Sequence, residues 1–281
     1  MIKMGRRAAL LILCALMAAG FSGCSLKSFE GLRYTVKDGG VVIRMYKDKS
    51  TVTVLEIPDE IDGKPVVKVE NFGAFNAPSL KTIKIGKNVR EIGPWAFTNN
   101  TALEAYIVDP LNAYFTAVDG VLLSKDRKTL IYYPIRKGVT TGKDGKVTGC
   151  APYTVPAGVE TIRTKAFYKC EYLETINLPA SLLSIEERAF GRDSALKGLI
   201  LPGKLQFIGK DAFAFCTSLT QLTVPASVSR IDDYAFYSCT SVKKLTMLGK
   251  EKDMTLGNKW YPTKNGMEMD DLKIIWVEHA G

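Results

Sequence analysis

Histidine is nearly absent from this sequence: its 281 residues include one, His279, two residues from the end. A catalytic imidazole needs an orienting partner and a rigid position, so chemistry that depends on histidine has little to build on. Six cysteines are too sparse for a disulfide scaffold, and no pair has the C-x-x-C spacing of a zinc site. No glycine-rich phosphate loop is visible either. We therefore expect no cofactor and no resident metal.

Long hydrophobic runs are also missing. The longest is the twelve-residue segment from Ala8 to Ala19, which is shorter than the roughly 20 apolar residues of a membrane-spanning helix. Lys3, Arg6 and Arg7 precede it. A positive segment followed by a short apolar one is typical of a secretory signal, so residues 1–23 are predicted to be a signal peptide.

The end of this signal resembles a bacterial lipobox, since Ser22 and Gly23 precede Cys24, although Phe21 stands where an aliphatic residue is usual. The resemblance implies cleavage before Cys24, lipid attachment to its thiol, and firm anchoring by two acyl chains. The protein is thus expected to be an extracytoplasmic, membrane-anchored lipoprotein at the cell surface or outer membrane, with residues 24–34 as a tether. The alternatives are a plain signal peptide and an uncleaved anchor.

Charge is moderate and unclustered. Lysine and arginine total 38 against 29 acidic residues, a net charge of +9, and removal of the signal would lower it to +6. A secreted basic protein suits acidic glycans, although an ordinary solvated surface explains the same charge. Without an arginine-rich run or an aromatic-basic stripe, no nucleic-acid partner is expected.

The body of the chain is a repeat. Alanine-phenylalanine pairs recur after gaps of 22, 70, 23, 23 and 23 residues. They are Ala74-Phe75, Ala96-Phe97, Ala166-Phe167, Ala189-Phe190, Ala212-Phe213 and Ala235-Phe236. A unit of 23 residues cannot bury its own apolar side, so neighbouring units must stack around one continuous core.

Each unit reads L-x-x-L-x-V-P-x-x-V-x-x-I-x-x-x-A-F, most clearly from Leu219 to Phe236. The alternation before the proline predicts a short strand, and proline ends it because it cannot continue a ladder. The A-F segment is predicted to turn on the far side of the coil. Its phenylalanines should lie one above the next as an aromatic ladder in the core.

Over about residues 50–248 this pattern resembles the leucine-rich repeat family, and within it the BspA-type repeats of bacterial surface proteins. The resemblance implies an α/β repeat that is mostly β: a right-handed solenoid with a parallel sheet on its concave face and capped ends. The predicted organisation is an N-terminal cap at residues 35–57, a solenoid at 58–248 with an irregular insert at about 104–154, and a C-terminal cap at 249–281. Asp119-Gly120 is a turn signal inside a hairpin-like unit of the insert.

Three cysteines share one repeat position, three residues after a ladder phenylalanine: Cys170, Cys216 and Cys239. We interpret them as buried thiols that serve as small apolar residues. Adjacent coils lie about 4.8 Å apart, so distance alone leaves a Cys216–Cys239 disulfide open. Cys170 lies two coils from Cys216, out of reach.

The residues flanking the inward positions of each strand should form the concave surface, where we place the ligand-binding candidates. They are Thr82, Lys84, Ile107, Thr175, Asn177, Ile200, Gln221, Thr223, Lys244 and Thr246, with Ala105 and Gly198 completing the row. No carboxylate is among these twelve, so a glycosidase on this face, which would need two, is not expected. Adaptable hydroxyl and amide groups around isolated isoleucines favour binding.

The resemblance and this surface together predict a lipid-anchored binding module that is not an enzyme. Its partner would be a protein or glycan at a host or microbial surface, bound for adhesion or protein–protein interaction. The alternatives are a structural envelope protein and a carboxylate-based hydrolase acting from the insert or from the C-terminal cap, where Asp270 and Asp271 lie.

Overall fold

The computed structural model describes residues 27–46, 51–70 and 77–277. The predicted signal peptide, Cys24, the Ala74-Phe75 pair and His279 lie outside these ranges. The described part is built from strands and turns, with one 3-10 helix, η1 (Glu251–Asp253), and no α-helix. None of its helical structure is long and apolar enough to cross a membrane. The predicted mostly-β repeat is confirmed.

The alternating segment of each unit forms the first ladder of parallel strands. It consists of three groups, β4 (Val54–Ile57), β7 (Thr82–Ile85) and β9 (Ala105–Val108); β15 (Tyr153–Thr154) and β17 (Ile176–Asn177); and β20 (Gln221–Val224), β22 (Lys244–Met247) and β24 (Lys273–Trp276). A bridge between Thr175 and Gly198 continues the middle group. Pro225 directly follows β20, as predicted for a strand that ends at proline.

A second ladder runs along another side of the coils and was not predicted. In the C-terminal half it consists of β12 (Thr129–Tyr132), β16 (Thr161–Ile162), β18 (Ser184–Ile185), β19 (Phe207–Ile208), β21 (Arg230–Ile231) and β23 (Thr255–Leu256), all parallel. Most of these strands have two residues, too few for period-two alternation to reveal them. Residues 249–276 add β23 to this ladder and β24 to the first, so one more irregular coil ends the described array.

The N-terminal half begins with antiparallel strands and then becomes a parallel coil. β1 (Lys27–Phe29), β2 (Leu32–Lys37) and β3 (Gly40–Tyr46) pair in sequence order. β3 then pairs in parallel with β6 (Lys64–Val69). The start of β6 pairs antiparallel with β5 (Glu60–Ile61), and its end pairs in parallel with β8 (Glu91–Ile92). β1 to β3 therefore cover the N-terminal end of the coils. Without them, the edge strand β6 would expose unpaired backbone N–H and C=O groups.

The core of the C-terminal half contains the predicted aromatic ladder. Phe167, Phe190, Phe213 and Phe236 are fully buried and stack with centroid distances of 4.9, 5.1 and 5.4 Å and interplanar angles of 10° or less. Each coil contributes one ring, so the distance between rings equals the distance between coils. The 23-residue period thus places the four phenylalanines in one continuous column.

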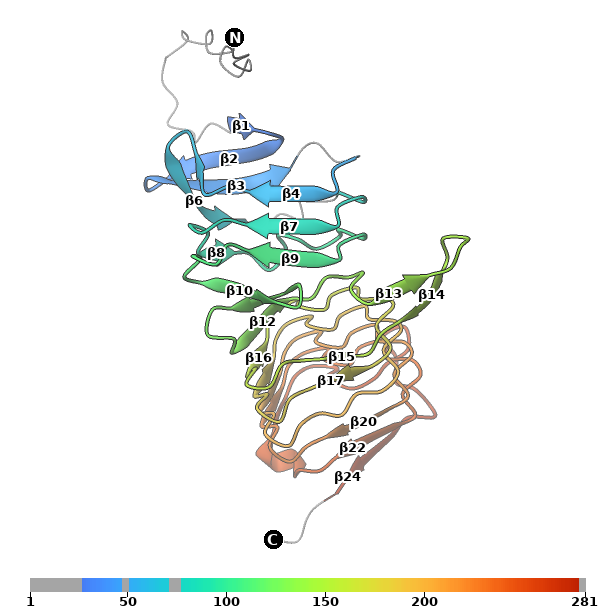
Figure 1. Ribbon diagram of the computed structural model, residues 1–281. Helices are drawn as coiled ribbons and strands as arrows, with labels where there is room; N and C mark the ends of the chain where they lie inside the picture. The colour runs from blue at the N-terminus through green and yellow to red at the C-terminus, as the bar shows by residue number, and fades with distance from the viewer. Residues whose placement is uncertain (1–26, 47–50, 71–76, 278–281) are drawn as a thin grey trace, which may run out of the picture.

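Two hairpins occupy the gap in the repeat. β10 (Phe115–Val118), β11 (Val121–Ser124) and β12 form an antiparallel unit whose last strand starts the second ladder of the C-terminal half. β13 (Val139–Thr141) and β14 (Val147–Cys150) form an arm that projects from the body (Figure 1). β9 stays in register with β7, so the first ladder extends through Val108 before this interruption.

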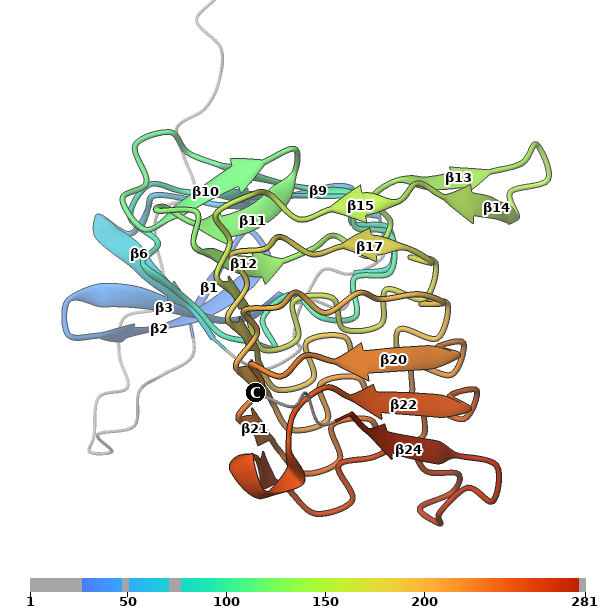
Figure 2. The same cartoon turned by 90° about the horizontal axis from the view of Figure 1, so that it is seen from below.

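Two hydrophobic cores meet at the first of these hairpins. Leu122, Ile131 and Tyr132 pack into the N-terminal core, whereas Val121, Leu123 and Leu130 pack into the C-terminal core. Both faces of β11 and β12 are thus buried, which explains why their sequences are continuously apolar and do not alternate. Figures 1 and 2 show that the coils of the two halves stack in different directions on either side of this unit.

Candidate binding face

The candidate residues all reach solvent, because the inward residues between them are buried. Ile83, Ile176, Leu222 and Leu245 are inward and buried, which turns their neighbours outward. Strand register then aligns these neighbours between coils, with Gln221 opposite Lys244 and Thr223 opposite Thr246. The exposed or half-buried candidates are Thr82, Lys84, Ile107, Thr175, Asn177, Ile200, Gln221, Thr223, Lys244 and Thr246.

These candidates fall into two groups. Thr82, Lys84 and Ile107 lie on β7 and β9 in the N-terminal half, while the other seven lie on the coils from β17 to β22. The hairpin unit separates the two groups, and the stacks on either side of it point in different directions (Figure 2). The face of the C-terminal half brings seven candidates together in one surface.

A shallow hollow of about 620 Å³ lies in this C-terminal face. Thr175, Asn177, Ile200 and Gln221 are among its lining residues. Gly198 lies between them, and a side chain added there would enter open space. Ile200 is 86% exposed, so a large apolar side chain faces solvent in a hollow that is also lined by hydroxyl and amide groups and by Lys197.

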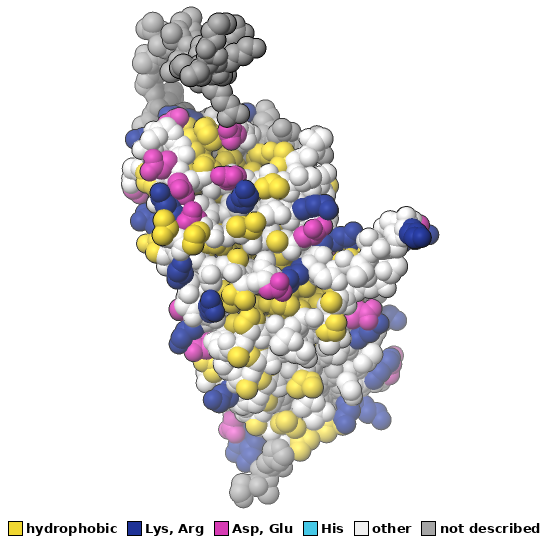
Figure 3. Space-filling model, viewed as in Figure 1, with side chains coloured by type: hydrophobic (Ala, Val, Ile, Leu, Met, Phe, Trp, Pro, Cys, Tyr) yellow, Lys and Arg dark blue, Asp and Glu magenta, His cyan; other side chains and the backbone are white. Residues whose placement is uncertain are grey.

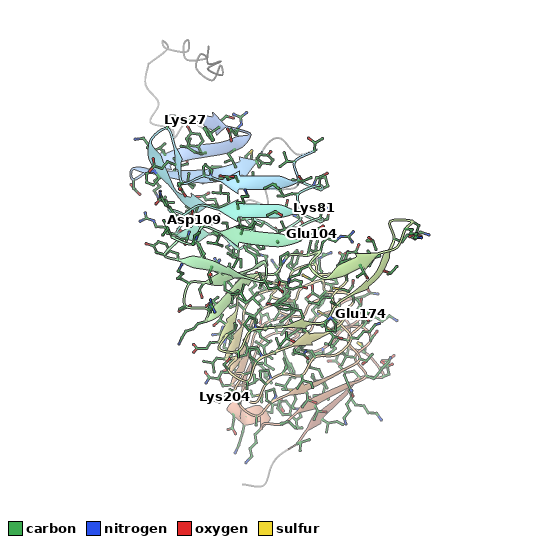
Figure 4. All side chains as sticks on the ribbon, in the orientation of Figure 1. Lys27, Lys81, Glu104, Asp109, Glu174 and Lys204 are labelled. Carbon is green, nitrogen blue, oxygen red and sulfur yellow. The ribbon has the colours of Figure 1, made fainter. Side chains whose placement is uncertain are left out.

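Ion pairs border the start of the first-ladder strands and link one coil to the next. Lys81 pairs with Glu104 at 3.1 Å and Lys197 pairs with Glu174 at 2.7 Å, while Lys243 pairs with Asp271. Figure 4 places Lys81, Glu104 and Glu174 along one side of the molecule. In the lower half of Figure 3, charged side chains lie mostly at the two sides of the view, with hydrophobic side chains and other atoms between them.

The structure adds outward positions that sequence analysis missed. Residues 54–57 were assigned to a cap, yet β4 pairs in register with β7 and turns Val54 and Glu56 outward. The expectation of a row without carboxylates is therefore incomplete: Glu56 is in it, 3.7 Å from Lys84. The residues Val54–Pro58, VLEIP, carry the strand-then-proline signal that could have revealed this coil.

The C-terminal strands extend the row in the same way. Thr154 accepts a hydrogen bond from the Asn177 amide at 3.1 Å, and Ile275 lies opposite Thr246. Glu56 is the one carboxylate that the described first ladder turns outward. Glycoside hydrolysis uses two carboxyl groups across the scissile bond, and this row supplies a single one.

The acidic residues before the Ala-Phe turns are engaged by the protein itself. Glu186 accepts hydrogen bonds from the backbone and hydroxyl of Thr164 at 2.9 and 3.0 Å. Asp232 pairs with Arg230 at 2.6 Å, and Asp233 accepts the Asn258 amide at 2.6 Å. Within residues 27–46, 51–70 and 77–277, no group of three or more histidine, cysteine or acidic side chains is arranged to hold a metal.

The repeat-locked cysteines are free thiols in the core. Cys216 donates to the carbonyl of Phe190 and Cys239 to that of Phe213, each at 3.1 Å. Burial raises the pKa of the Cys216 thiol, which makes it a poor nucleophile. Asn100 and Asp193 occupy the same position in other coils and accept backbone amides there. The position therefore supports the turn between coils.

Comparison with known proteins agrees with this geometry. A family model described as BspA type leucine rich repeat region matches residues 46–114 and 149–258, with six copies. The unmatched segment between them holds the β10–β12 unit and nearly all of the β13–β14 arm. Among curated proteins, no match is found.

Solved structures resemble the whole array. The pneumococcal vaccine antigen PcpA is 16% identical, with a TM-score of 0.51 over 92% of this chain and 99% of that chain. A leucine-rich repeat protein from Eubacterium ventriosum is 16% identical, with a TM-score of 0.47 over 83% and 93%. A leucine rich cell surface protein from Faecalibacterium prausnitzii is 19% identical, with a TM-score of 0.44 over 90% and 76%.

At these identities the likeness to PcpA shows the fold alone. The family match covers more than half of the chain. In the matched regions the first-ladder strands, the prolines that end them and the stacked phenylalanines recur with the same period. The chain belongs to the BspA-type leucine-rich repeat family.

Proposed function

We propose that the protein is a surface-anchored binding module that attaches to a protein or glycan partner through the first-ladder face of its C-terminal half. Membership of the BspA-type leucine-rich repeat family supports this location and role. A fold alone does not establish a function, so the proposal rests on the face itself.

The observation that carries the proposal is the exposed Ile200 in the shallow hollow. Binding interfaces concentrate their energy in a few apolar anchors surrounded by polar groups that exclude water. Here Thr175, Asn177 and Gln221 supply adaptable hydrogen-bonding groups around the anchor. The coils are joined by backbone ladders, so this face loses little conformational freedom when a partner binds.

Ile200→Asp tests this face, and Leu111→Asp is its matched control because Leu111 is also exposed (77%) and lies in the loop after β9. The assay is binding of the purified protein to immobilised extracellular-matrix proteins and to a glycan array, with unfolding temperature measured in parallel. We expect Ile200→Asp, or Gln221→Arg with Thr223→Arg, to reduce binding at least tenfold at unchanged stability. Retained binding by these variants would refute the proposed face.

The lipid anchor is a separate part of the proposal and falls on Cys24, outside the described residues. Intact mass spectrometry of the membrane fraction should find a mature chain that begins at Cys24 and carries a diacylglycerol. Cys24→Ser should release the protein from the membrane. An unmodified mature chain starting near Cys24 would instead indicate a freely secreted binder, whereas stable co-purification with envelope proteins would favour a structural role.

A further inference from the structure

A second hollow, of about 430 Å³, lies at the Ala-Phe turns and shares no lining residue with the first. It forms because one column of turn residues changes size along the stack. The residue after each ladder phenylalanine is Tyr168, then Gly191, Ala214 and Tyr237 in successive coils. Gly191 and Ala214 are small and form the floor of the hollow. Tyr168 and Tyr237 lie at its two ends, three coil steps or about 15 Å apart.

The sides of this hollow come from two further columns that the backbone turns outward. In the four coils from Ala166 to Phe236, the residue before each alanine and the second residue after each phenylalanine have left-handed backbones, as in Arg188, Arg192, Asp211 and Phe215 with φ between 53° and 65°. Non-glycine residues rarely adopt this conformation, and here each of these four turns imposes it. Arg188 and Asp211 form one side of the hollow, and Arg192 and Phe215 the other.

The lining is aromatic and cationic. The Arg192 guanidinium lies 5.0 Å from the Phe215 ring centroid, and Phe215 meets Tyr237 edge-on at 5.6 Å. Arg188 is already neutralised, because Asp211 accepts two of its hydrogen bonds at 2.8 and 3.0 Å. Arg192 is exposed and has no ion pair within the described part of the chain. It is the free cation of the hollow, and its planar fork matches a carboxylate.

Main-chain recognition of a peptide is not available at this edge. The amide of Arg192 donates to Ala214, and that of Phe215 donates to Tyr237, each at 2.8 Å. The turn backbones are thus paired from coil to coil and leave no open strand edge for an extended peptide. A ligand must instead be recognised by side chains, within a hollow whose size is typical of small-ligand sites.

From this geometry we infer that the turn hollow binds an acidic saccharide unit, a sugar ring that carries a carboxylate. Arg192 holds the carboxylate in a bidentate hydrogen-bonded pair. The Phe215 ring packs against the apolar C–H face of the sugar, and the Arg188–Asp211 pair faces its hydroxyl groups. Tyr168 and Tyr237 close the two ends of the hollow.

The test is titration of the full protein with glucuronic acid and, as a matched neutral sugar, glucose, followed by saturation-transfer NMR and calorimetry. We expect millimolar binding of glucuronic acid, at least fivefold tighter than that of glucose, and weakened by salt. Arg192→Gly should abolish the preference for the acid, and Phe215→Gly should weaken both sugars. Glycine suits the left-handed backbone at both positions, so these variants delete the side chains without straining the fold.

Two further variants sharpen the test. Ala214→Tyr should fill the floor and block both sugars, since tyrosine already occupies this position in the next coil, as Tyr237. Lys204→Gln removes one exposed charge on another side of the molecule and should change nothing. Equal glucuronic acid binding by the wild type and Arg192→Gly would overturn the inference. Arg192-dependent binding of a Glu-Glu dipeptide without binding of either sugar would also overturn it.

Discussion

A single buried carboxyl group shows how closely each repeat position is defined. Asp193 is buried at the position where other coils have asparagine or cysteine, and its Oδ1 accepts the Cys170 amide at 2.7 Å. Burial raises the pKa of Asp193 well above its ordinary value. The folded protein therefore holds this proton more tightly than the unfolded chain, and the stabilising contribution is lost as pH rises above about 4.

Asp193→Asn should keep the amide contact, as Asn100 does in its own coil, and remove the titrating group. We expect the variant to be more stable than the wild type at pH 7, with the difference shrinking toward pH 4. Urea unfolding at several pH values measures this. Glu251→Gln, at an exposed carboxylate in η1, should show no such gain, and a destabilised Asp193→Asn at pH 7 would contradict the argument.

Lys165 supplies an opposite dependence on pH. It is buried with its Nζ 2.9 Å from the Trp95 ring centroid. Burial lowers the pKa of Lys165 to about 8, despite the attraction of Glu187 and Asp211. Between about pH 8 and 10.5 the folded protein binds fewer protons here than the unfolded chain, so stability rises with pH in this window.

Lys165→Met removes this titration while filling the same space. The free energy of unfolding of the wild type, measured relative to the variant, should rise by up to about 3 kcal/mol from pH 7 to pH 10.5. Comparison with the variant cancels the buried tyrosines and cysteines, which titrate in both proteins. A flat difference across this range would show that Lys165 does not change its protonation on unfolding.

At the scale of the element, the phenylalanine ladder joins each coil to the next. Phe213 lies between two stacked rings at 5.1 and 5.4 Å, so its loss affects both neighbouring coils. Phe213→Ala should cost about 3–5 kcal/mol, and Phe213→Leu less, because leucine fills more of the space. Chemical unfolding measures both, and a cost below 1 kcal/mol for alanine would show that the ladder is dispensable.

The β11–β12 strands show where sequence patterns lose information. A strand buried on one face alternates, but these two are buried by different cores on both faces. Their sequences VLLS and TLIY therefore predict strands without indicating which side is inside. The β10–β11 hairpin was predictable from its turn, Asp119-Gly120. The position of β11 and β12 between two cores was not.

At the scale of the whole molecule, a few contacts couple the two halves across the interruption. The Tyr132 hydroxyl donates to the carbonyl of Gly93 at 2.7 Å, and Arg163 donates to that of Ile92 at 2.8 Å. Neighbouring repeats unfold together only when the interface between them is stable enough. These contacts therefore favour unfolding of both cores in one cooperative transition.

Tyr132→Phe combined with Arg163→Met should weaken this coupling while keeping the packed volume. We expect one thermal transition in the wild type and two in the double variant, with the cost of the lost hydrogen bonds near 1 kcal/mol each. Calorimetry and hydrogen exchange measure this. One unchanged transition in the double variant would show that hydrophobic contact at the hairpin is sufficient for coupling.

Much of this protein follows from its sequence alone. The 23-residue period, the stacked phenylalanines, the strand that ends at proline and the outward positions near Ile200 and Gln221 all depend on local pattern and nearest neighbours. Repetition makes such features readable, because each coil meets the same neighbours as the last.

Only the tertiary structure decided what happens where the period breaks or where columns from different coils meet. The hairpin divides the candidate face into two groups, because strands buried on both faces carry no directional pattern. The turn hollow needs small residues in two coils and a left-handed backbone that directs Arg192 and Phe215 outward. Neither condition shows in a single repeat, since the hollow arises from differences between repeats that only the stack brings together.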